Sequence, residues 1–263
     1  IFSLYRELSQ RILERFGVRA TPAEHVLLGQ QARITDSFKA YEFFIRAKSA
    51  YYEQSEDALL VAAGLLEQAT REDPAFGLAY AYLSRIHEQR ALLLGRTGRP
   101  GYQESVSRSS EYLAKAAEHG EGIAEVHRIL ADVLYSKGDT VRAAQEIQKS
   151  LYLNPMDAGA WLTKWRIQGK GDPLHPAIQR ALEIDPAAAE INTEIGRAYA
   201  AKNQFAEALY HLTRAFDKGP DSVALHYVFA DTYLRMGGRT EAAVASYERI
   251  IELSSTEVTA HIE

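Results

Sequence analysis

Apolar and small residues recur along this chain in a unit of about 34 residues, a period typical of helical repeats. The stretches 124–155 and 189–220 show the unit most clearly. In each, an apolar residue precedes a small one, an alanine opens a second segment, a bulky apolar residue follows four positions later, and a proline closes the unit. The corresponding pairs are Leu130-Ala131 and Ile195-Gly196, Ala143 and Ala208, Ile147 and Leu212, and Pro155 and Pro220. This spacing predicts two helices per unit, joined by a turn.

The physical roles of the recurring positions agree with paired helices. A small residue in each helix lets the two approach closely, while bulky neighbours fill the space between them. A proline follows the second helix because it cannot continue one. Turn residues lie between the two halves, at 137–139, 202–203 and 237–238. A single unit cannot bury its own apolar face, so we expect the units to stack into one continuous array.

The repeated pattern closely resembles the tetratricopeptide repeat (TPR), a pair of antiparallel helices per repeat, over residues 36–257. The resemblance implies an all-α fold, a right-handed superhelix of antiparallel helix pairs. We expect six TPR-like repeats, at 36–75, 76–123, 124–157, 158–188, 189–222 and 223–257. The second is about 14 residues too long, and its excess predicts longer helices joined by the basic turn at 95–101.

The two ends of the chain do not follow the repeat. In the segment 1–35, an apolar stripe over 1–16 predicts one helix, and a capping motif at 21–24 predicts a second. Asp36 or Ser37 is expected to cap a third helix that begins at Phe38. Residues 258–263 are expected to begin a further helix.

Several short runs before the repeats form a second, looser pattern. They are Phe2-Ser3-Leu4, Glu7-Leu8-Ser9-Gln10-Arg11-Ile12, Gly17-Val18, Thr21-Pro22-Ala23-Glu24 and Ala40-Tyr41-Glu42. These runs are similar to the junction before the repeats in bacterial multidomain signalling proteins, including some class III nucleotide cyclases and winged-helix transcription regulators. The similarity implies that this chain is the C-terminal part of a longer protein, with 1–35 as the junction to an upstream domain. The absence of an initiator methionine points the same way.

Composition limits the classes of function. With 30 basic and 35 acidic residues, the formal net charge is −5, which argues against a nucleic-acid scaffold with a concentrated basic face. No apolar run approaches the roughly 18 residues of a membrane span. The chain has no cysteine, which removes disulfides, thiolate metal sites and cysteine nucleophiles. This composition leaves open whether the protein is cytoplasmic, which we favour, or periplasmic.

The sequence contains none of the common catalytic motifs. A zinc-protease HExxH, a hydrolase GxSxG, a Walker loop and a dinucleotide fingerprint are all missing. Gly169-Lys170-Gly171 comes nearest to a phosphate loop, but it follows no predicted strand and is interpreted as a turn. The 8 histidines are scattered along the chain. We therefore expect no catalytic residue, no metal and no cofactor.

The resemblance to TPR proteins also implies a binding surface, because the first helix of each repeat lines a concave groove in that family. The candidates carried over by position are Arg85, Gln89, Arg128, Asp132, Tyr135, Arg166, Arg197, Tyr227 and Asp231. Arginines in four successive repeats favour an acidic peptide or a C-terminal carboxylate as the partner. The alternative is that these arginines form ion pairs between repeats, with Asp132, Glu125, Glu190 or Glu194. The lysine and asparagine pattern of the chaperone-binding carboxylate clamp is missing, so we expect no binding to a chaperone tail.

Two functions are consistent with these features of the sequence. The first is a scaffold that binds a segment of a partner protein in the groove. The alternative is a regulatory, self-associating C-terminal module of a bacterial signalling protein, because solenoids expose apolar end faces unless a polar helix caps them. The two differ in whether the chain binds a foreign peptide or mainly a second copy of itself.

Overall fold

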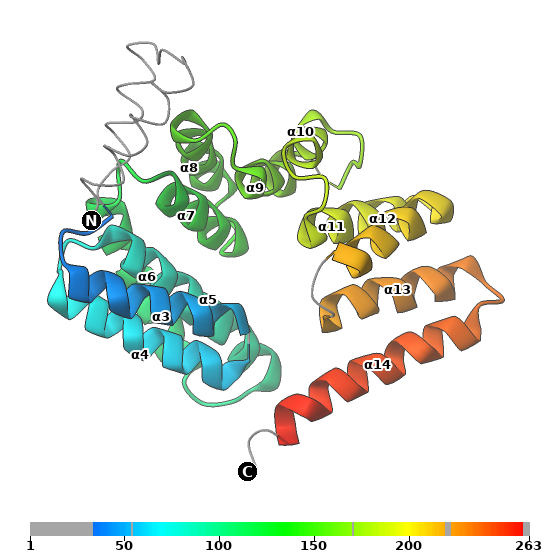
Figure 1. Ribbon diagram of the computed structural model, residues 1–263, viewed down its shortest axis with the longest axis horizontal. Coiled ribbons are helices and arrows are strands. Elements are labelled where there is room, and N and C mark those ends of the chain that lie inside the picture. Colours follow the sequence, from blue (N-terminus) through cyan, green and yellow to red (C-terminus); the bar gives the residue numbers. More distant parts are fainter. Residues whose placement is uncertain (1–33, 54, 170, 219–221, 260–263) are drawn as a thin grey trace, which may run out of the picture. The chain divides into compact units, whose positions relative to one another are not determined.

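A computed structural model describes residues 34–53, 55–169, 171–218 and 222–259, and these form twelve α-helices with no strand (Figure 1). The predicted all-α class is confirmed, and the helices pack as consecutive pairs. The pairs are α3 (Phe38–Glu53) with α4 (Glu56–Glu72), α5 (Gly77–Thr97) with α6 (Tyr102–His119), α7 (Ala124–Ser136) with α8 (Thr140–Leu153), α9 (Ala158–Gln168) with α10 (Pro176–Ile184), α11 (Ala189–Ala201) with α12 (Phe205–Lys218), and α13 (Val223–Met236) with α14 (Thr240–Thr259). The helices predicted within 1–33 and the closing Pro220 lie outside the described residues.

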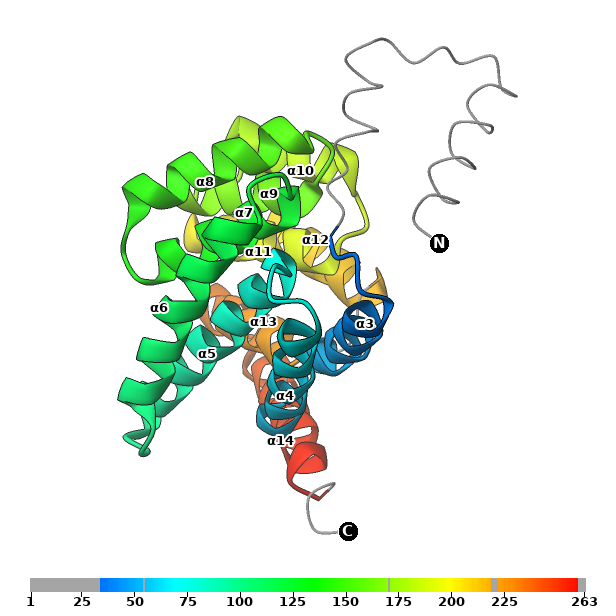
Figure 2. The ribbon, with the colours of Figure 1, turned by 90° about the vertical axis from the view of Figure 1, so that its left-hand side faces the viewer.

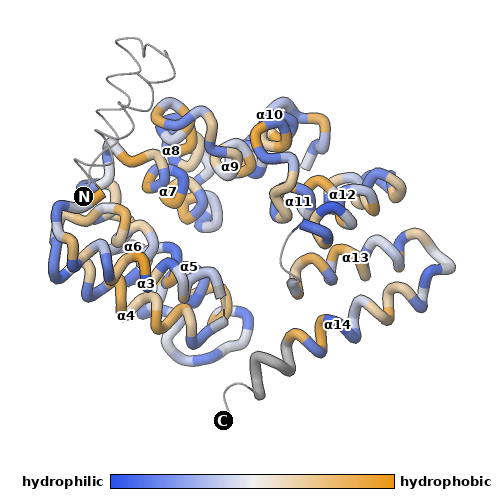
Figure 3. The backbone as a smooth tube through the Cα atoms, viewed as in Figure 1, coloured by the Kyte–Doolittle hydropathy of each residue, from blue (hydrophilic) through white to orange (hydrophobic). Residues whose placement is uncertain are grey.

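By its internal contacts the chain divides into two compact units, Ile1–Pro155 and Met156–Glu263. Each unit has its own apolar core. The core of the first unit is built from α3 to α7, and the second unit has one core around α9 to α11 and another around α12 and α13. Every helix carries both hydrophobic and hydrophilic positions, as expected of helices with one buried face (Figure 3). None of the described helices combines the length and the apolar character that crossing a membrane requires.

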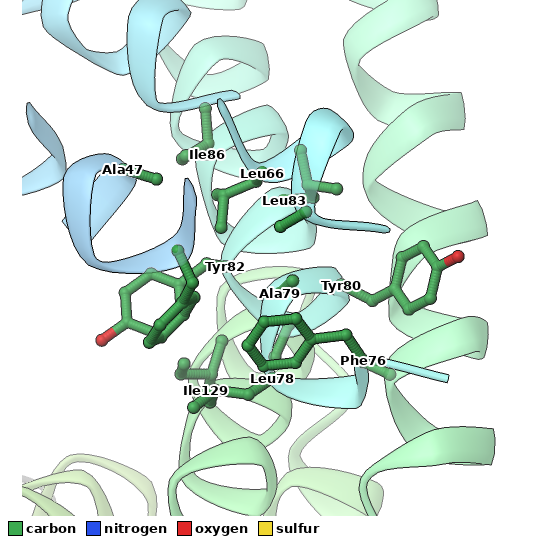
Figure 4. Packing of buried hydrophobic residues seen from close by; sticks show 14 of the residues in the cluster. Ala47, Leu66, Phe76, Leu78, Ala79, Tyr80, Tyr82, Leu83, Ile86 and Ile129 are labelled. Carbon is green, nitrogen blue, oxygen red and sulfur yellow. The ribbon is translucent and has the colours of Figure 1, made fainter. Parts of the chain in front are cut away.

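Helix α5 forms the centre of the first unit. Its Leu83 and Ile86 are fully buried and share a core with Leu66 of α4 (Figure 4). The ring of Phe44 on α3 lies 5.2 Å, centroid to centroid, from Phe76 at the start of α5. Burying a side chain of this size contributes about 1.5–3 kcal/mol. The position of α5 relative to α3 and α4 is therefore fixed by the core.

The pair α5 and α6 is elongated, as the sequence predicted, with 21 and 18 residues in the two helices (Figure 2). The turn between them needs glycine at both ends, because Gly98 and Gly101 have φ of 65° and 94°. Arg99 in this turn donates a 2.7 Å hydrogen bond to Oε2 of Glu56, at the start of α4. The added turns are therefore anchored to the neighbouring helix pair.

The structure describes the start of α3, where the sequence predicts a capping residue, and the end of α14, where it predicts the start of a further helix. Ser37 caps α3, since its Oγ accepts a 3.2 Å hydrogen bond from the amide of Ala40. Helix α14 continues without a break through Val258 and Thr259, so these residues do not begin a new helix as the sequence predicted. The reason is that Ser255 stands where four of the other five repeats have a closing proline, and serine does not stop a helix. Residues 260–263 lie outside the described part of the chain.

In the second unit, a small residue sets the distance between α11 and α12. A Cβ added to Gly196 would lie 2.7 Å from Cδ2 of Leu212, which is closer than any ordinary contact. The apolar–small pair of the repeat pattern therefore has the role that its spacing predicts. The connection from α9 to α10 is fixed differently, by the indole of Trp165, which donates a 2.7 Å hydrogen bond to the carbonyl of Asp172.

Candidate functional site

Charged side chains gather on one face of the first unit, where α3, α5 and α7 contribute in parallel. These three helices run in the same direction because α4 and α6, joined to them by short turns, run back between them. The group, called the ionic cluster below, consists of Lys48 on α3, Tyr82 and Arg85 on α5, and Glu125, Arg128 and Asp132 on α7.

Glu125 is the centre of the ionic cluster. The phenol of Tyr82 donates a 2.6 Å hydrogen bond to its Oε1. Nζ of Lys48 lies 3.4 Å from the same oxygen, and Nη2 of Arg128 lies 3.6 Å from it. The ammonium of Lys48 is also 5.7 Å from the centroid of the Tyr82 ring, a cation–π distance. One carboxylate thus connects all three helices.

Asp132 is the second carboxylate of the ionic cluster and lies about two turns after Glu125 on α7. Its Oδ2 lies 3.8 Å from Nη1 of Arg85 and 3.9 Å from Nη1 of Arg128. Burial is the largest single influence on Arg85 and opposes its charge, but Asp132, Tyr51 and Glu88 together outweigh burial and raise the pKa of Arg85 above its ordinary value. Burial and the charge of Glu125 likewise raise the pKa of Tyr82, so this phenol stays protonated.

The cation–carboxylate contacts of the cluster are longer than the strongest charge-assisted hydrogen bonds. Its cation–carboxylate distances run from 3.4 to 3.9 Å, whereas a charge-assisted N–H···O bond is about 2.7–2.9 Å long. At these contacts the basic side chains are held near the two carboxylates by attraction rather than by short hydrogen bonds.

Two further candidates, Gln89 and Tyr135, follow the cluster along the same helices. Gln89 lies one turn after Arg85, and its buried Oε1 has no hydrogen-bond partner among the described residues. Tyr135 lies one turn after Asp132 and is 38% exposed. The structure thus brings Arg85, Arg128 and Asp132 together and places these two side chains next to them.

The candidates of the second unit make tighter internal contacts. Nη2 of Arg166 on α9 donates hydrogen bonds of 2.8 Å to Glu190 and 3.2 Å to Glu194, both on α11. Arg197 lies 3.6 Å from Glu194, one turn away on the same helix. All four candidate arginines of the chain thus contact the carboxylates that the sequence offered as alternative partners: Asp132, Glu125, Glu190 and Glu194.

Helix α13 carries the last two candidates. Tyr227 is exposed, and its ring lies 6.3 Å from that of Tyr247 on α14 at a near-perpendicular angle. Asp231, one turn further on, is 3.8 Å from Arg235. Neither residue is brought into contact with Arg166 or Arg197 by any described interaction.

Sequence reasoning missed Lys48 and Tyr82. Lys48 lies in the first repeat, whose irregular length gave no positions to carry over from the family. Tyr82 has the helical spacing of a core residue, and its ring is buried, but its hydroxyl also reaches Glu125. The sequence of α3 gives one indication of this site, which is that Lys48 follows the buried Phe44 by four residues and so lies on the same side of the helix. Across the described residues, no group of three His, Asp or Glu side chains is arranged to hold a metal ion.

Comparisons with known proteins agree on the architecture. The family model described as Tetratricopeptide repeat matches residues 175–222 and 193–258. Among solved structures, a thermophilic TPR protein of Thermus thermophilus is similar, with 19% identity, a TM-score of 0.58, and coverage of 74% of this chain and 99% of that one. The protein pilF of Pseudomonas aeruginosa follows with 12% identity, a TM-score of 0.54, and coverage of 82% and 91%.

A third structure, yeast Tom70, is 15% identical, with a TM-score of 0.51 and coverage of 85% of this chain and 55% of that one. At these identities the likeness concerns the fold alone. A comparison with curated proteins gives no match.

Proposed function

We propose that this chain, in which residues 175–222 and 193–258 match the Tetratricopeptide repeat model, is a protein-binding scaffold whose site is the face of α3, α5 and α7 that bears the ionic cluster. The partner is a segment with an acidic side chain or a C-terminal carboxylate. The observation that supports this proposal is the gathering of Lys48, Arg85 and Arg128 around two carboxylates at distances of 3.4–3.9 Å.

An incoming carboxylate would compete with Glu125 and Asp132 for these cations. Guanidinium groups are suited to this because each presents a planar fork of donors that matches both oxygens of a carboxylate. The side chains of Arg85 and Arg128 are 25% and 26% exposed, so they are partly desolvated yet reachable. Partial desolvation strengthens a new ion pair relative to one at a fully exposed surface.

The second unit offers a weaker case for the same function. Arg166 already donates hydrogen bonds of 2.8 Å to Glu190 and 3.2 Å to Glu194. Arg197 is the more available cation, since its side chain is 56% exposed. We therefore assign the main site to the first unit and treat Arg197 as a secondary contact.

A pull-down with matched baits tests this proposal. The baits are the unaltered chain, the Arg85→Glu/Arg128→Glu variant and the Arg46→Glu variant, with captured proteins identified by mass spectrometry. Arg46 is an exposed arginine on the opposite side of α3 from Lys48, so it controls for reversing one surface charge away from the ionic cluster. We expect one set of partners captured by the unaltered and Arg46→Glu baits and lost with the double variant. Capture that survives the double reversal would refute the assigned site.

Self-association is a second candidate function, favoured by the last helix pair. Val244 and Tyr247 are exposed apolar or aromatic side chains one turn apart on α14. Exposed apolar stripes on the terminal helix of an array favour contact with a second copy. Light scattering coupled to size-exclusion chromatography tests this, and a dimer that becomes monomeric in Val244→Glu would support it.

A further inference from the structure

The elongated helix α5 extends the binding face with apolar side chains. We propose that Tyr52, Leu92 and Tyr135, called the apolar platform below, bind a large apolar side chain of the same partner segment whose carboxylate meets the ionic cluster. This inference rests on the proposed function and specifies the partner further. It also assigns a role to the extra turns of the α5–α6 pair, namely to provide Leu92.

Helical spacing places the platform on the same face as the ionic cluster. Tyr52 follows Lys48 by four residues on α3, Leu92 follows Arg85 by seven on α5, and Tyr135 follows Arg128 by seven on α7. Residues four and seven apart lie on one side of a helix. Because the three helices run in the same direction, all three platform residues lie towards the same end of the face.

The platform side chains are exposed. The exposed fractions are 65% for Tyr52, 53% for Leu92 and 38% for Tyr135. Three large exposed apolar or aromatic groups on parallel helices of one unit are a feature that favours an interaction site, whereas single exposed apolar residues need no explanation. Tyrosine also contributes a large contact area at a small cost in conformational entropy.

The part of α5 that carries Leu92 is packed against its neighbours. Ala91 and Leu94, on its other side, are buried. The ring of Tyr102 on α6 lies 3.2 Å from where a Cβ on Gly95 would be, so the two helices pack closely there. The extra turns of α5 are thus a packed part of the fold. Leu92 is exposed because it lies on the outer side of this helix.

Charge around the platform favours an acidic segment as the occupant. Arg96 follows Leu92 by four residues, is exposed and has no ion-pair partner within the described residues. Together with Lys48, Arg85 and Arg128 it gives this face four cations, against the three carboxylates of Glu125, Asp132 and Glu88. The platform is also continuous along α5 with the ionic cluster, so one ligand can contact both.

Helix geometry gives the spacing that the partner needs. Seven helical residues separate Arg85 from Leu92, a rise of about 10 Å. An extended peptide covers this distance in about three residues. The occupant we infer is therefore an extended acidic segment with a leucine or phenylalanine about three residues from a carboxylate.

A peptide array tests this inference on the whole chain. The probes are short peptides of glycine and serine that carry a glutamate pair and a leucine–phenylalanine pair at different separations and in both orders. Binding of the unaltered chain is compared with that of Leu92→Gln, Tyr52→Ser, and the control Val61→Gln. Val61 is 57% exposed on α4, so it matches Leu92 in exposure but lies on another helix.

We expect the strongest binding at a separation of about three residues, and a loss of about tenfold in Leu92→Gln but not in Val61→Gln. Unchanged melting temperatures would show that the variants fold. Acidic peptides that bind equally well to Leu92→Gln, while Arg128→Glu abolishes binding, would overturn the platform and leave the proposed function standing. Binding that depends on neither residue would refute both. A Leu92→Gln variant that changes the oligomeric mass instead would assign the platform to a second copy of the chain and overturn the inference.

Discussion

The hydroxyl of Tyr82 on α5 donates a 2.6 Å hydrogen bond to Glu125 on α7 and so connects the buried core to the charged face. The ring of Tyr82 packs within the core beside Phe44, and only its polar end reaches the carboxylate. The same side chain therefore stabilises the fold and orients the central anion of the ionic cluster.

Removing this hydroxyl should measure that contribution. Tyr82→Phe leaves the ring packing intact but removes a hydrogen bond to a charged acceptor, which costs about 1.5–3 kcal/mol of unfolding free energy. Urea unfolding of the variant gives the value. Tyr152→Phe is the control, since Tyr152 is almost fully exposed on α8. Equal stabilities for the two variants would show that the hydrogen bond carries no net energy.

His87 makes stability depend on pH. Both its ring nitrogens are buried without a hydrogen-bond partner among the described residues. Burial, and then the charges of Arg108 and Arg90, lower the pKa of His87 from 6.5 to about 4. The unfolded chain therefore takes up this proton near pH 6.5 and the folded protein only near pH 4, so stability falls as pH drops through that window.

The shift in the pKa of His87 corresponds to a loss of about 3 kcal/mol of unfolding free energy as the pH falls from 6.5 to about 4. We expect His87→Leu, which puts here the residue found at the equivalent position of the third repeat, to flatten this part of the profile. Denaturant unfolding at several pH values makes the measurement. An unchanged pH profile in His87→Leu would show that other groups cause the dependence.

Gly196 and Gly64 should respond in opposite directions to a substitution by alanine. A Cβ on Gly196 meets Leu212 at 2.7 Å, so Gly196→Ala forces α11 and α12 apart and costs about 1–3 kcal/mol. A Cβ on Gly64, within α4, meets nothing within 4 Å, so Gly64→Ala should stabilise the helix by about 0.5–1 kcal/mol. Thermal unfolding distinguishes them, and a stabilised Gly196→Ala would refute the tight contact.

These contrasts explain what the sequence could predict. The helix pairs follow from local rules, because the small residue at Gly196 and the bulky one at Leu212 are spaced for close packing of α11 and α12. The ionic cluster does not follow from local rules. It includes Lys48, which lies in a repeat of irregular length, and its contact distances depend on how three helices pack. Sequence spacing alone could not distinguish a short internal ion pair, as at Arg166, from the looser contacts of Arg128.

The two units should differ in their response to charge reversal. Arg128→Glu places a third carboxylate beside Glu125 and Asp132, which should repel an acidic partner. Arg197→Glu changes an exposed side chain near Glu194, whose partner Arg166 remains. Pull-down yields should therefore fall strongly with Arg128→Glu and only slightly with Arg197→Glu. The reverse order would move the main site to the second unit.

The central claim is that the cations of the ionic cluster bind a carboxylate of a partner. The most direct measurement is a fluorescence anisotropy titration of a labelled glutamate-rich peptide against the unaltered chain, Arg85→Glu/Arg128→Glu and Arg46→Glu, at low and high salt. We predict saturable binding that weakens with salt, is retained in Arg46→Glu and is lost in the double variant. Equal binding by all three proteins, or by none, would contradict it.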